Sequence, residues 1–313
     1  MINRREFRNA EQELRIQKQI QELAKIYLAA QKGIKAELRR LDITDFRRSR
    51  SEAILKEINL ILRGLNFKSR QWAEKAIPDA YRRGFDLAGE QLKKMRVTSF
   101  VDFDKPIHTS AVGILVDDIT FDLVYANNSI ERNVNRFIRE TQQRILEDKE
   151  ISRMIAEGVV RGETRRAVSD SLLESFRKRM AEEQFITING RNYRPDYYAE
   201  LIARTRGREA SSQGTINTAL AYDVDLVQWS VHSGACPVCQ DLQGKIFSIS
   251  GTNDDFPALT SDTTPPAHPH CAHVLTPVLS EVLRKRGQYE GLSRFSRGGL
   301  KAESFKQFLE LIR

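Results

Sequence analysis

The segments CPVC at residues 236–239 and HPHCAH at residues 268–273 decide how the C-terminal third of this chain folds. They contain all 3 cysteines of the chain and three of its 5 histidines. Two ligand pairs with two residues between them, C-x2-C and H-x2-C, supply the four sulfur and nitrogen atoms that a tetrahedral zinc ion takes. We therefore predict one structural zinc ion with the ligands Cys236, Cys239, His268 and Cys271.

The fourth ligand is less fixed by the spacing than the three cysteines are. His268 has the two-residue gap before Cys271 that suits a second knuckle, whereas His273 would reach the metal from a C-x-H spacing. His270 is adjacent to Cys271, and neighbouring side chains in an extended turn point apart. We prefer His268 and keep His273 as the alternative.

Other interpretations of the cluster fit the sequence less well. Buried cysteines without a metal would leave the clustering of every cysteine unexplained. A redox pair needs a helix N-terminus to lower the thiol pKa, whereas here a turn and another strand follow the pair. A zinc deaminase needs H-x-E before its P-C-x-x-C segment, but Ser233 and Gly234 follow His232. We predict a closed structural site, in which zinc ties the turn after a strand at 226–231 to the end of the polar loop 251–267.

Most of the chain has the apolar spacing of helices. Helical patterns cover residues 4–41, 49–65, 69–95, 109–147, 163–180, 195–222 and 301–313, and Pro78 is expected to break or kink the third of them. Alternating apolar residues on both sides of Asn189-Gly190 predict a β-hairpin, and residues 226–231 and 245–249 have the pattern of strands. The predicted fold is mainly α, with long helices in the N-terminal part and a small α+β zinc-binding C-terminal domain.

The predicted domain organisation has five parts. They are a basic long-helix domain at 1–96, a linker at 97–108, a helical middle region at 109–184, the α+β zinc-binding domain at 185–280, and a tail with a short helix at 281–313.

The positive charge of the chain is concentrated in its first third. The net charge is +8, and residues 1–100 hold 23 Lys and Arg against 13 Asp and Glu. Such a field attracts polyanions and favours sequence-independent DNA contact, although a solvated helix surface can have the same composition. No stretch approaches the roughly 20 apolar residues of a membrane span, and residues 1–7 lack a signal-peptide core. We expect synthesis in a cytoplasm and no membrane partner.

Five short segments of this sequence occur together, in the same order, in a known protein family. They are Arg204-Thr205-Arg206, Val227-Gln228-Trp229, the CPVC segment, residues 242–247 and residues 265–271. Over residues 150–280 the chain resembles the Mu F-like minor head proteins of tailed bacteriophages, also called phage head morphogenesis proteins. The family commonly has Arg-Cys after its His-Pro-x-Cys segment, where this chain has Ala272-His273, which keeps His273 as a candidate ligand.

The resemblance implies a minor structural protein of the virion that is not an enzyme. Such proteins lie inside the capsid near the portal, so the expected partners are the portal protein, other capsid proteins and DNA. The expected role is in head morphogenesis, with DNA packaging or ejection as a further part. The alternative is a metal-dependent nuclease built on the zinc knuckles, with His232 or His270 as its base.

Overall fold

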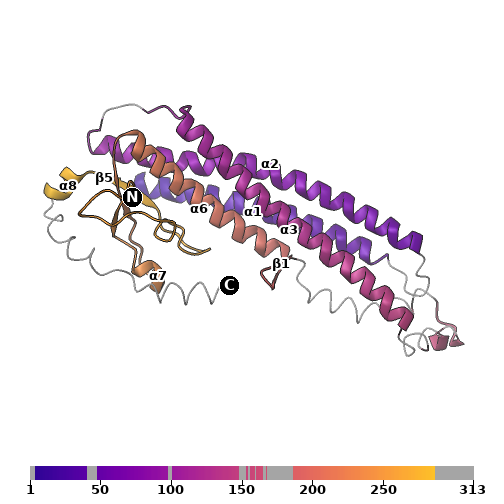
Figure 1. Cartoon of the computed structure of the whole chain (residues 1–313). Coiled ribbons are helices and arrows are strands. Elements are labelled where there is room, and N and C mark those ends of the chain that lie inside the picture. Colours follow the sequence, from indigo (N-terminus) through magenta and orange to yellow (C-terminus); the bar gives the residue numbers. More distant parts are fainter. Residues whose placement is uncertain are drawn as a thin grey trace. The chain divides into compact units, whose positions relative to one another are not determined.

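The computed structural model describes residues 4–40, 48–97, 101–147 and 186–285, together with a few residues between 153 and 167. Four long helices dominate it: α1 (Arg4–Leu38), α2 (Arg48–Lys94), α3 (Pro106–Glu147) and α6 (Pro195–Ala221) (Figure 1). The shorter elements are β1 (Ile186–Ile188), β2 (Arg191–Tyr193), β3 (Leu226–Trp229), α7 (Pro237–Gln240), β4 (Ile246–Ser248), β5 (Leu275–Val278) and α8 (Ser280–Lys285). Long helices followed by a few small strands confirm the predicted fold class.

The chain divides into two compact units. The first unit consists of Met1–Ile16, Ala73–Ile119 and Leu201–Arg313, and the second of Gln17–Trp72 and Thr120–Glu200. Helices α1, α2, α3 and α6 each contribute residues to both units. The domain boundaries expected from the sequence, at residues 96, 108, 184 and 280, stay a prediction.

The helices of the second unit bury apolar residues at helical spacing. On α1 these are Ile20, Leu23, Tyr27, Ala30, Ile34 and Leu38, in steps of three and four. The predicted hairpin is present as β1 and β2, and its turn residues Asn189 and Gly190 have positive φ angles of 49° and 75°. The backbone N–H of Thr187 donates to Ser129 Oγ of α3 at 2.8 Å, which ties the hairpin to that helix.

Two predicted helix boundaries differ from the structure. The separation of helices at 49–65 and 69–95 is wrong, because α2 is continuous and does not end at Pro78. A proline removes one backbone hydrogen bond, and here the buried neighbours Ile77 and Ala80 stabilise the helix through tertiary packing. Helix α3 begins at Pro106, before the predicted start at residue 109, since the fixed φ of proline suits the first helical turn. The predicted helix at 163–180 falls almost wholly, and that at 301–313 wholly, outside the described residues.

In the first unit, α2 and α6 approach so closely that glycine is required on both. A Cβ atom at Gly84 would overlap the carbonyl oxygen of Ser211, and one at Gly214 would overlap that of Tyr81. Beside this crossing, Asn217 donates to the Tyr81 hydroxyl at 2.8 Å. The two helices therefore form a tightly packed pair that ends next to the small sheet.

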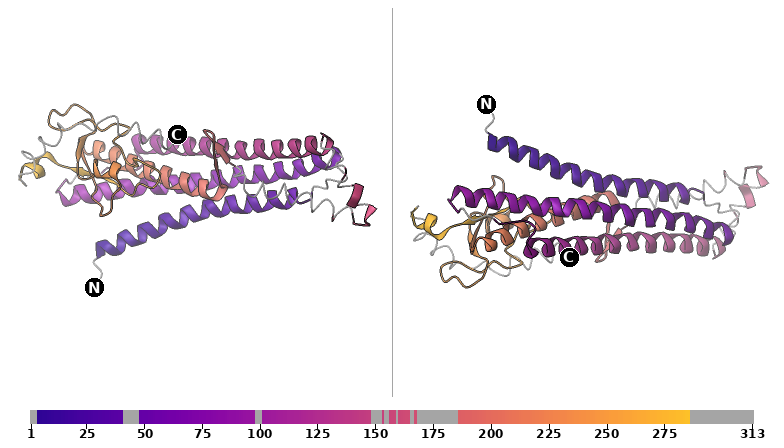
Figure 2. Two further views of the ribbon diagram at one scale, coloured as in Figure 1. Left: turned by 90° about the horizontal axis from the view of Figure 1, so that it is seen from below. Right: turned by 90° about the horizontal axis from the view of Figure 1, so that it is seen from above.

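The sheet has the strand order β4-β3-β5, with both pairs antiparallel. Its strands, with α7 and α8, gather near the end of α6 (Figures 1 and 2). Strands β3 and β4 confirm the two predicted strands, whereas β5 was not predicted. Among the described residues, no helix combines the length and the apolarity that crossing a membrane requires.

Candidate metal centre

The first arm of the centre is the turn between β3 and β4. Pro237 begins the single-turn helix α7, with Cys236 in an extended conformation just before it. After the helix, the backbone N–H groups of Leu242 and Gln243 both donate to the carbonyl of Cys239, at 3.1 and 2.8 Å. This turn folds the chain back toward β4 and places the Cys236 and Cys239 sulfurs on one side.

The second arm precedes β5. The backbone N–H of Cys271 donates to the carbonyl of His268 at 2.9 Å, so residues 268–271 form a tight turn. Cys271 is buried, His268 is half-buried and His270 is exposed. The turn thus presents the first and last of these residues to the other arm, as the H-x2-C spacing predicts.

The structure brings five candidate ligands together. Cys236, Cys239 and His268 form one group, and Cys239, Cys271 and His273 form a second group that shares Cys239. All four residues predicted from the sequence lie in the cluster, together with the alternative His273. His270 belongs to neither group of described residues.

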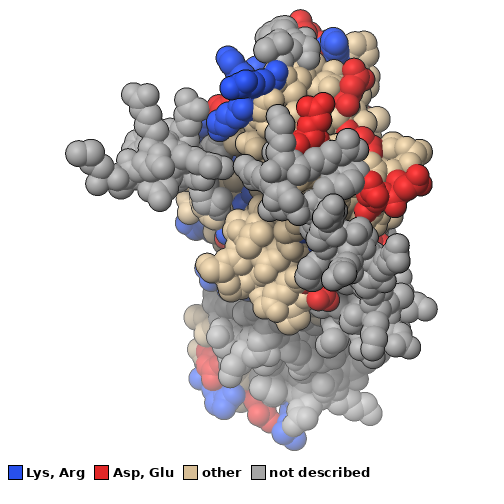
Figure 3. Space-filling model, turned by 90° about the vertical axis from the view of Figure 1, so that its left-hand side faces the viewer, with Lys and Arg blue, Asp and Glu red and all other residues tan. Residues whose placement is uncertain are grey.

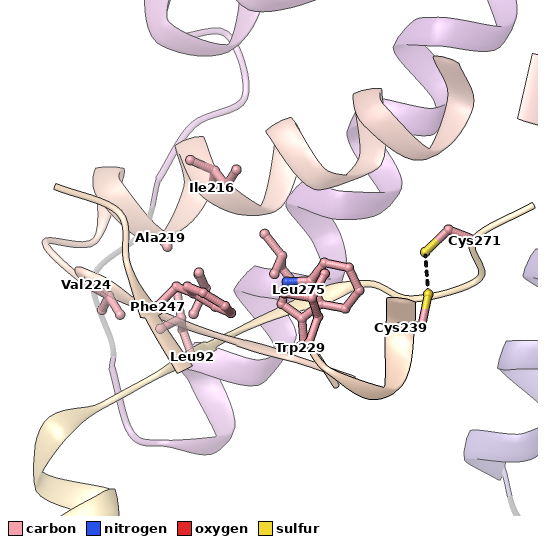
Figure 4. Close-up of a cluster of buried hydrophobic side chains, with 11 residues drawn as sticks. Leu92, Ile216, Ala219, Val224, Trp229, Cys239, Phe247, Cys271 and Leu275 are labelled. Carbon is pink, nitrogen blue, oxygen red and sulfur yellow. Dashed lines mark hydrogen bonds between the residues drawn. The ribbon is translucent and has the colours of Figure 1, made fainter. Parts of the chain in front are cut away.

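The distances between ligand atoms fit a tetrahedral ion. Zn–S bonds of about 2.3 Å and Zn–N bonds of about 2.0 Å would separate tetrahedral sulfurs by about 3.8 Å, and sulfur from nitrogen by about 3.5 Å. The Sγ atoms of Cys239 and Cys271 are 3.8 Å apart (Figure 4). His268 Nε2 lies 3.3 Å from Cys236 Sγ and 3.2 Å from Cys239 Sγ, and His273 Nδ1 lies 3.7 Å from Cys271 Sγ. Each group of three therefore has distances suited to a metal ion, whereas Cys271 is grouped with neither Cys236 nor His268, so the four predicted ligands meet around one ion only after their side chains move.

The pKa shifts of the cysteine and histidine side chains follow chiefly from their burial. Burial, and then the neighbouring Cys271, raises the pKa of the Cys239 thiol. Burial also lowers the pKa of His268 and of His273, which keeps both imidazoles in the neutral form that binds metals. A bound cation would deprotonate the thiols, because a coordinating thiol loses its proton outright.

The sequence profile of the phage minor capsid protein 2 family matches residues 110–304, which is more than half of the chain. The chain belongs to this family. The match includes both arms of the metal centre and confirms the resemblance to phage minor head proteins. No curated protein and no solved structure matches the chain.

Membership of a minor capsid family gives the protein a structural role in the phage head and a location in the virion. Other phage proteins are accordingly its partners.

The metal centre of this capsid protein is continuous with an apolar core. Cys239 and Cys271 belong to the same buried cluster as Trp229, Phe247 and Leu275, which packs against α6 (Figure 4). His273 lies against Trp229, with ring centroids 5.3 Å apart. Its Nε2 is buried with no hydrogen-bond partner among the described residues. Metal binding and core packing therefore stabilise the same small module.

The long polar loop after β4 is tethered, as its length requires. The indole Nε1 of Trp229 donates to the carbonyl of Thr263 at 2.7 Å. At the start of the loop, the Asp225 carboxylate accepts hydrogen bonds from Ser248 Oγ and from the backbone N–H of Ser250, both at 2.7 Å. Burial opposes ionisation of Asp225, but these hydrogen bonds outweigh it and lower its pKa. Nothing in the sequence pattern singled out Asp225.

The two histidines considered as a nuclease base lie beside the centre. His232 is exposed, and its Nε2 is 2.9 Å from Ser230 Oγ. Its ring meets that of His273 edge-on, with centroids 4.6 Å apart. Neither His232 nor His270 belongs to a group of candidate ligands among the described residues.

Proposed function

We propose that this protein is a non-enzymatic minor component of the phage head that lies inside the capsid near the portal and contributes to head morphogenesis. A zinc ion closes its C-terminal module and makes it a rigid docking unit for the portal and other capsid proteins. The observation that carries this proposal is the convergence of three cysteines and two histidines from two turns that lie about 30 residues apart in the sequence.

Zinc suits the centre better than other common metals. Thiolate and imidazole ligands favour zinc, whereas calcium and magnesium take oxygen ligands. Both candidate groups consist of Cys and His alone among the described residues. Cys239 and Cys271 are 1% and 4% exposed and Cys236 and His268 are half-buried, and such shielding of the sulfurs suits a structural rather than a catalytic site.

We assign Cys236, Cys239, His268 and Cys271 as the ligands. His268 Nε2 approaches two sulfurs within 3.3 Å, whereas His273 Nδ1 comes within 3.7 Å of one. His273 then lies against the outside of the centre and packs on Trp229. It remains the alternative fourth ligand, and the experiment has to include it.

The test is the metal content of the purified protein and of five variants. We expect about one zinc per chain, lost in Cys236→Ser and Cys271→Ser and strongly reduced in His268→Ala. His273→Ala should retain the metal. His270→Ala is the matched control, since that exposed residue lies between the second arm's ligands His268 and Cys271 and belongs to neither candidate group. Full metal content in Cys271→Ser would refute the zinc assignment, and loss in His273→Ala alone would move the fourth ligand to that residue.

Contact with DNA is the second part of the proposal, and it rests on α1. Lys18, Lys25 and Lys32 are exposed and recur every seven residues, so they lie on one side of the helix about 10 Å apart. The face drawn in Figure 3 carries a group of Lys and Arg at its upper left, Asp and Glu to the right of it, and residues of both signs together at its lower end. Evenly spaced cations on one helix face suit a phosphate backbone without reading its bases.

The test of this part is the salt dependence of binding to a mixed-sequence duplex. Replacing the three lysines with glutamine should lower the slope of log K against log salt concentration by about 2.7, at about 0.9 per phosphate contact. A triple replacement of the exposed Lys56, Lys68 and Lys75 on α2 removes the same charge as a control. Equal effects of both replacements would remove α1 from the proposal, and absence of binding at low salt would remove DNA altogether.

A further inference from the structure

A cavity of about 360 Å³ lies beside the metal centre, within the first unit. Its walls come from α2, α6 and the segment that carries Cys271. The lining residues are Ile16, Arg83, Leu87, Arg204, Gly207, Arg208, Ser211, His232, Pro269, His270, Cys271, Ala272 and Val274. We call it the arginine cavity, because three of the lining residues are arginines.

Helical spacing places the arginines in the cavity. Arg204, Gly207, Arg208 and Ser211 follow one another in steps of three, one and three residues, so they share one face of α6. Arg83 comes from the facing helix α2 and is half-buried, as are Arg204 and Arg208. A Cβ atom at Gly207 would meet nothing within 4 Å. The absence of a side chain there keeps the space between the two α6 arginines open.

The charge of the lining has one sign. Three arginines and two histidines line the cavity, and no Asp or Glu is among the lining side chains in the part of the chain that the structure describes. Arg206 lies on another face of α6, forms an ion pair with Glu209 at 2.8 Å and does not line the cavity. The cationic lining is thus a local feature and not the general character of α6.

We propose that the arginine cavity is a binding site for a phosphate group. The planar guanidinium fork donates two parallel hydrogen bonds to a phosphate, and a half-buried site strengthens this attraction over that in water. Arginines on two facing helices can approach a phosphate from more than one side, because its oxygens are arranged tetrahedrally, whereas a planar carboxylate offers only two oxygens. The phosphate belongs either to a DNA backbone or to a free phosphate ion.

The cavity is also coupled to the metal centre. Residues 269–272 form one wall, and Cys271 within that wall is a ligand in the proposed zinc site. Metal binding would therefore fix the wall against α6. This coupling rests on the proposed function, whereas the phosphate site itself rests on the arginines.

The test uses inorganic phosphate, pyrophosphate and a fluorescently labelled mixed-sequence duplex, titrated into the full chain at low salt. Arg204→Gln and Arg208→Gln should each weaken pyrophosphate binding about tenfold or more, because each removes charge-assisted hydrogen bonds. Gly207→Leu should weaken it similarly by filling the space while every charge is retained. Arg206→Gln is the matched control and should bind as the wild type does. Circular dichroism and zinc content show whether each variant is folded.

The outcomes separate the possible sources and the two proposals. If phosphate displaces the duplex and the same variants weaken duplex binding, the ligand is a DNA phosphate. If phosphate binds but the duplex is unaffected, the ligand is free phosphate. Absence of saturable phosphate binding, an equal loss in Arg206→Gln, or tighter binding of an acidic peptide would each overturn the inference. If the purified protein contains no zinc and still binds phosphate, the metal proposal is refuted and the phosphate-site proposal is retained.

Discussion

The two tryptophans of the chain allow the metal centre to be tested apart from the helices. Trp229 lies in the first unit and Trp72 in the second, and both are buried, at 1% and 5% exposure. Each indole donates to a backbone carbonyl: Trp229 to Thr263 at 2.7 Å, and Trp72 to Gln19 at 2.8 Å. The replacements Trp229→Phe and Trp72→Phe therefore each remove one hydrogen bond of the same kind, from an indole N–H to a backbone carbonyl, in different units.

The expected cost follows from two terms. Leaving a buried carbonyl without its donor costs about 1–3 kcal/mol. The smaller ring also leaves unfilled space, at about 0.8 kcal/mol for each lost methylene-sized group. We expect each replacement to lower the free energy of unfolding of its own unit by about 2–4 kcal/mol, as measured by urea denaturation.

Metal removal distinguishes the two variants. In Trp72→Phe the remaining fluorophore is Trp229, which shares a buried cluster with Cys239 and Cys271. Addition of a chelator should shift its emission to longer wavelength as the cluster opens to water. In Trp229→Phe the remaining fluorophore, Trp72, should keep its emission unchanged. Unchanged Trp229 emission after the metal has been removed would refute the reasoning that the ion holds this core together, and an equal shift of both would show that its effect is not local.

Three further predictions concern packing, pH and catalysis. Gly214→Ala should destabilise the protein, because the new Cβ would overlap a backbone carbonyl. Gly89→Ala has open space around it and should leave the stability unchanged or raise it by up to about 1 kcal/mol. Thermal unfolding of the two variants compares them. Because the pKa of Asp225 is lowered in the folded state, its stabilisation is full above the unfolded pKa of about 4 and is lost as the pH falls through the folded value. The difference in stability between wild type and Asp225→Asn should therefore shrink from pH 7 to pH 3, and a constant difference would contradict it. A plasmid-nicking assay with magnesium or manganese should show no cleavage, and cleavage abolished by His232→Ala with zinc content unchanged would establish the nuclease alternative.

Much of the fold follows from local pattern. The burial of Ile20, Leu23 and Tyr27 on α1 repeats the spacing seen in the sequence, and Asn189-Gly190 alone locates the hairpin. The continuity of α2 was not predicted, because tertiary packing, which has no local signal, decides it. Pro78 does not end α2, since the residues around it are buried in a long helix pair.

The metal cluster could be predicted because its chemistry is written in residue type and spacing. Three cysteines and a histidine are recognisable as candidate ligands from their spacing. The sequence could not show how closely His273 approaches Cys271. The arginine cavity could not be predicted in this way. Arg204 and Arg208 line a cavity only together with Arg83 and the Cys271 segment, and the fold brings these parts beside them from distant positions in the chain.

The size of the small sheet explains why a metal is suited to this module. Its three strands have 4, 3 and 4 residues, and the loop between β4 and β5 contains no further strand in the described chain. So little buried apolar surface stabilises a fold only marginally, whereas binding free energy from a structural zinc adds directly to folding free energy. The two arms that would hold the ion are the connections on either side of β4, so a bound ion limits the movement of both. The module then keeps one shape against α6 without a larger core, and the same constraint holds residues 269–272 in place as a wall of the arginine cavity.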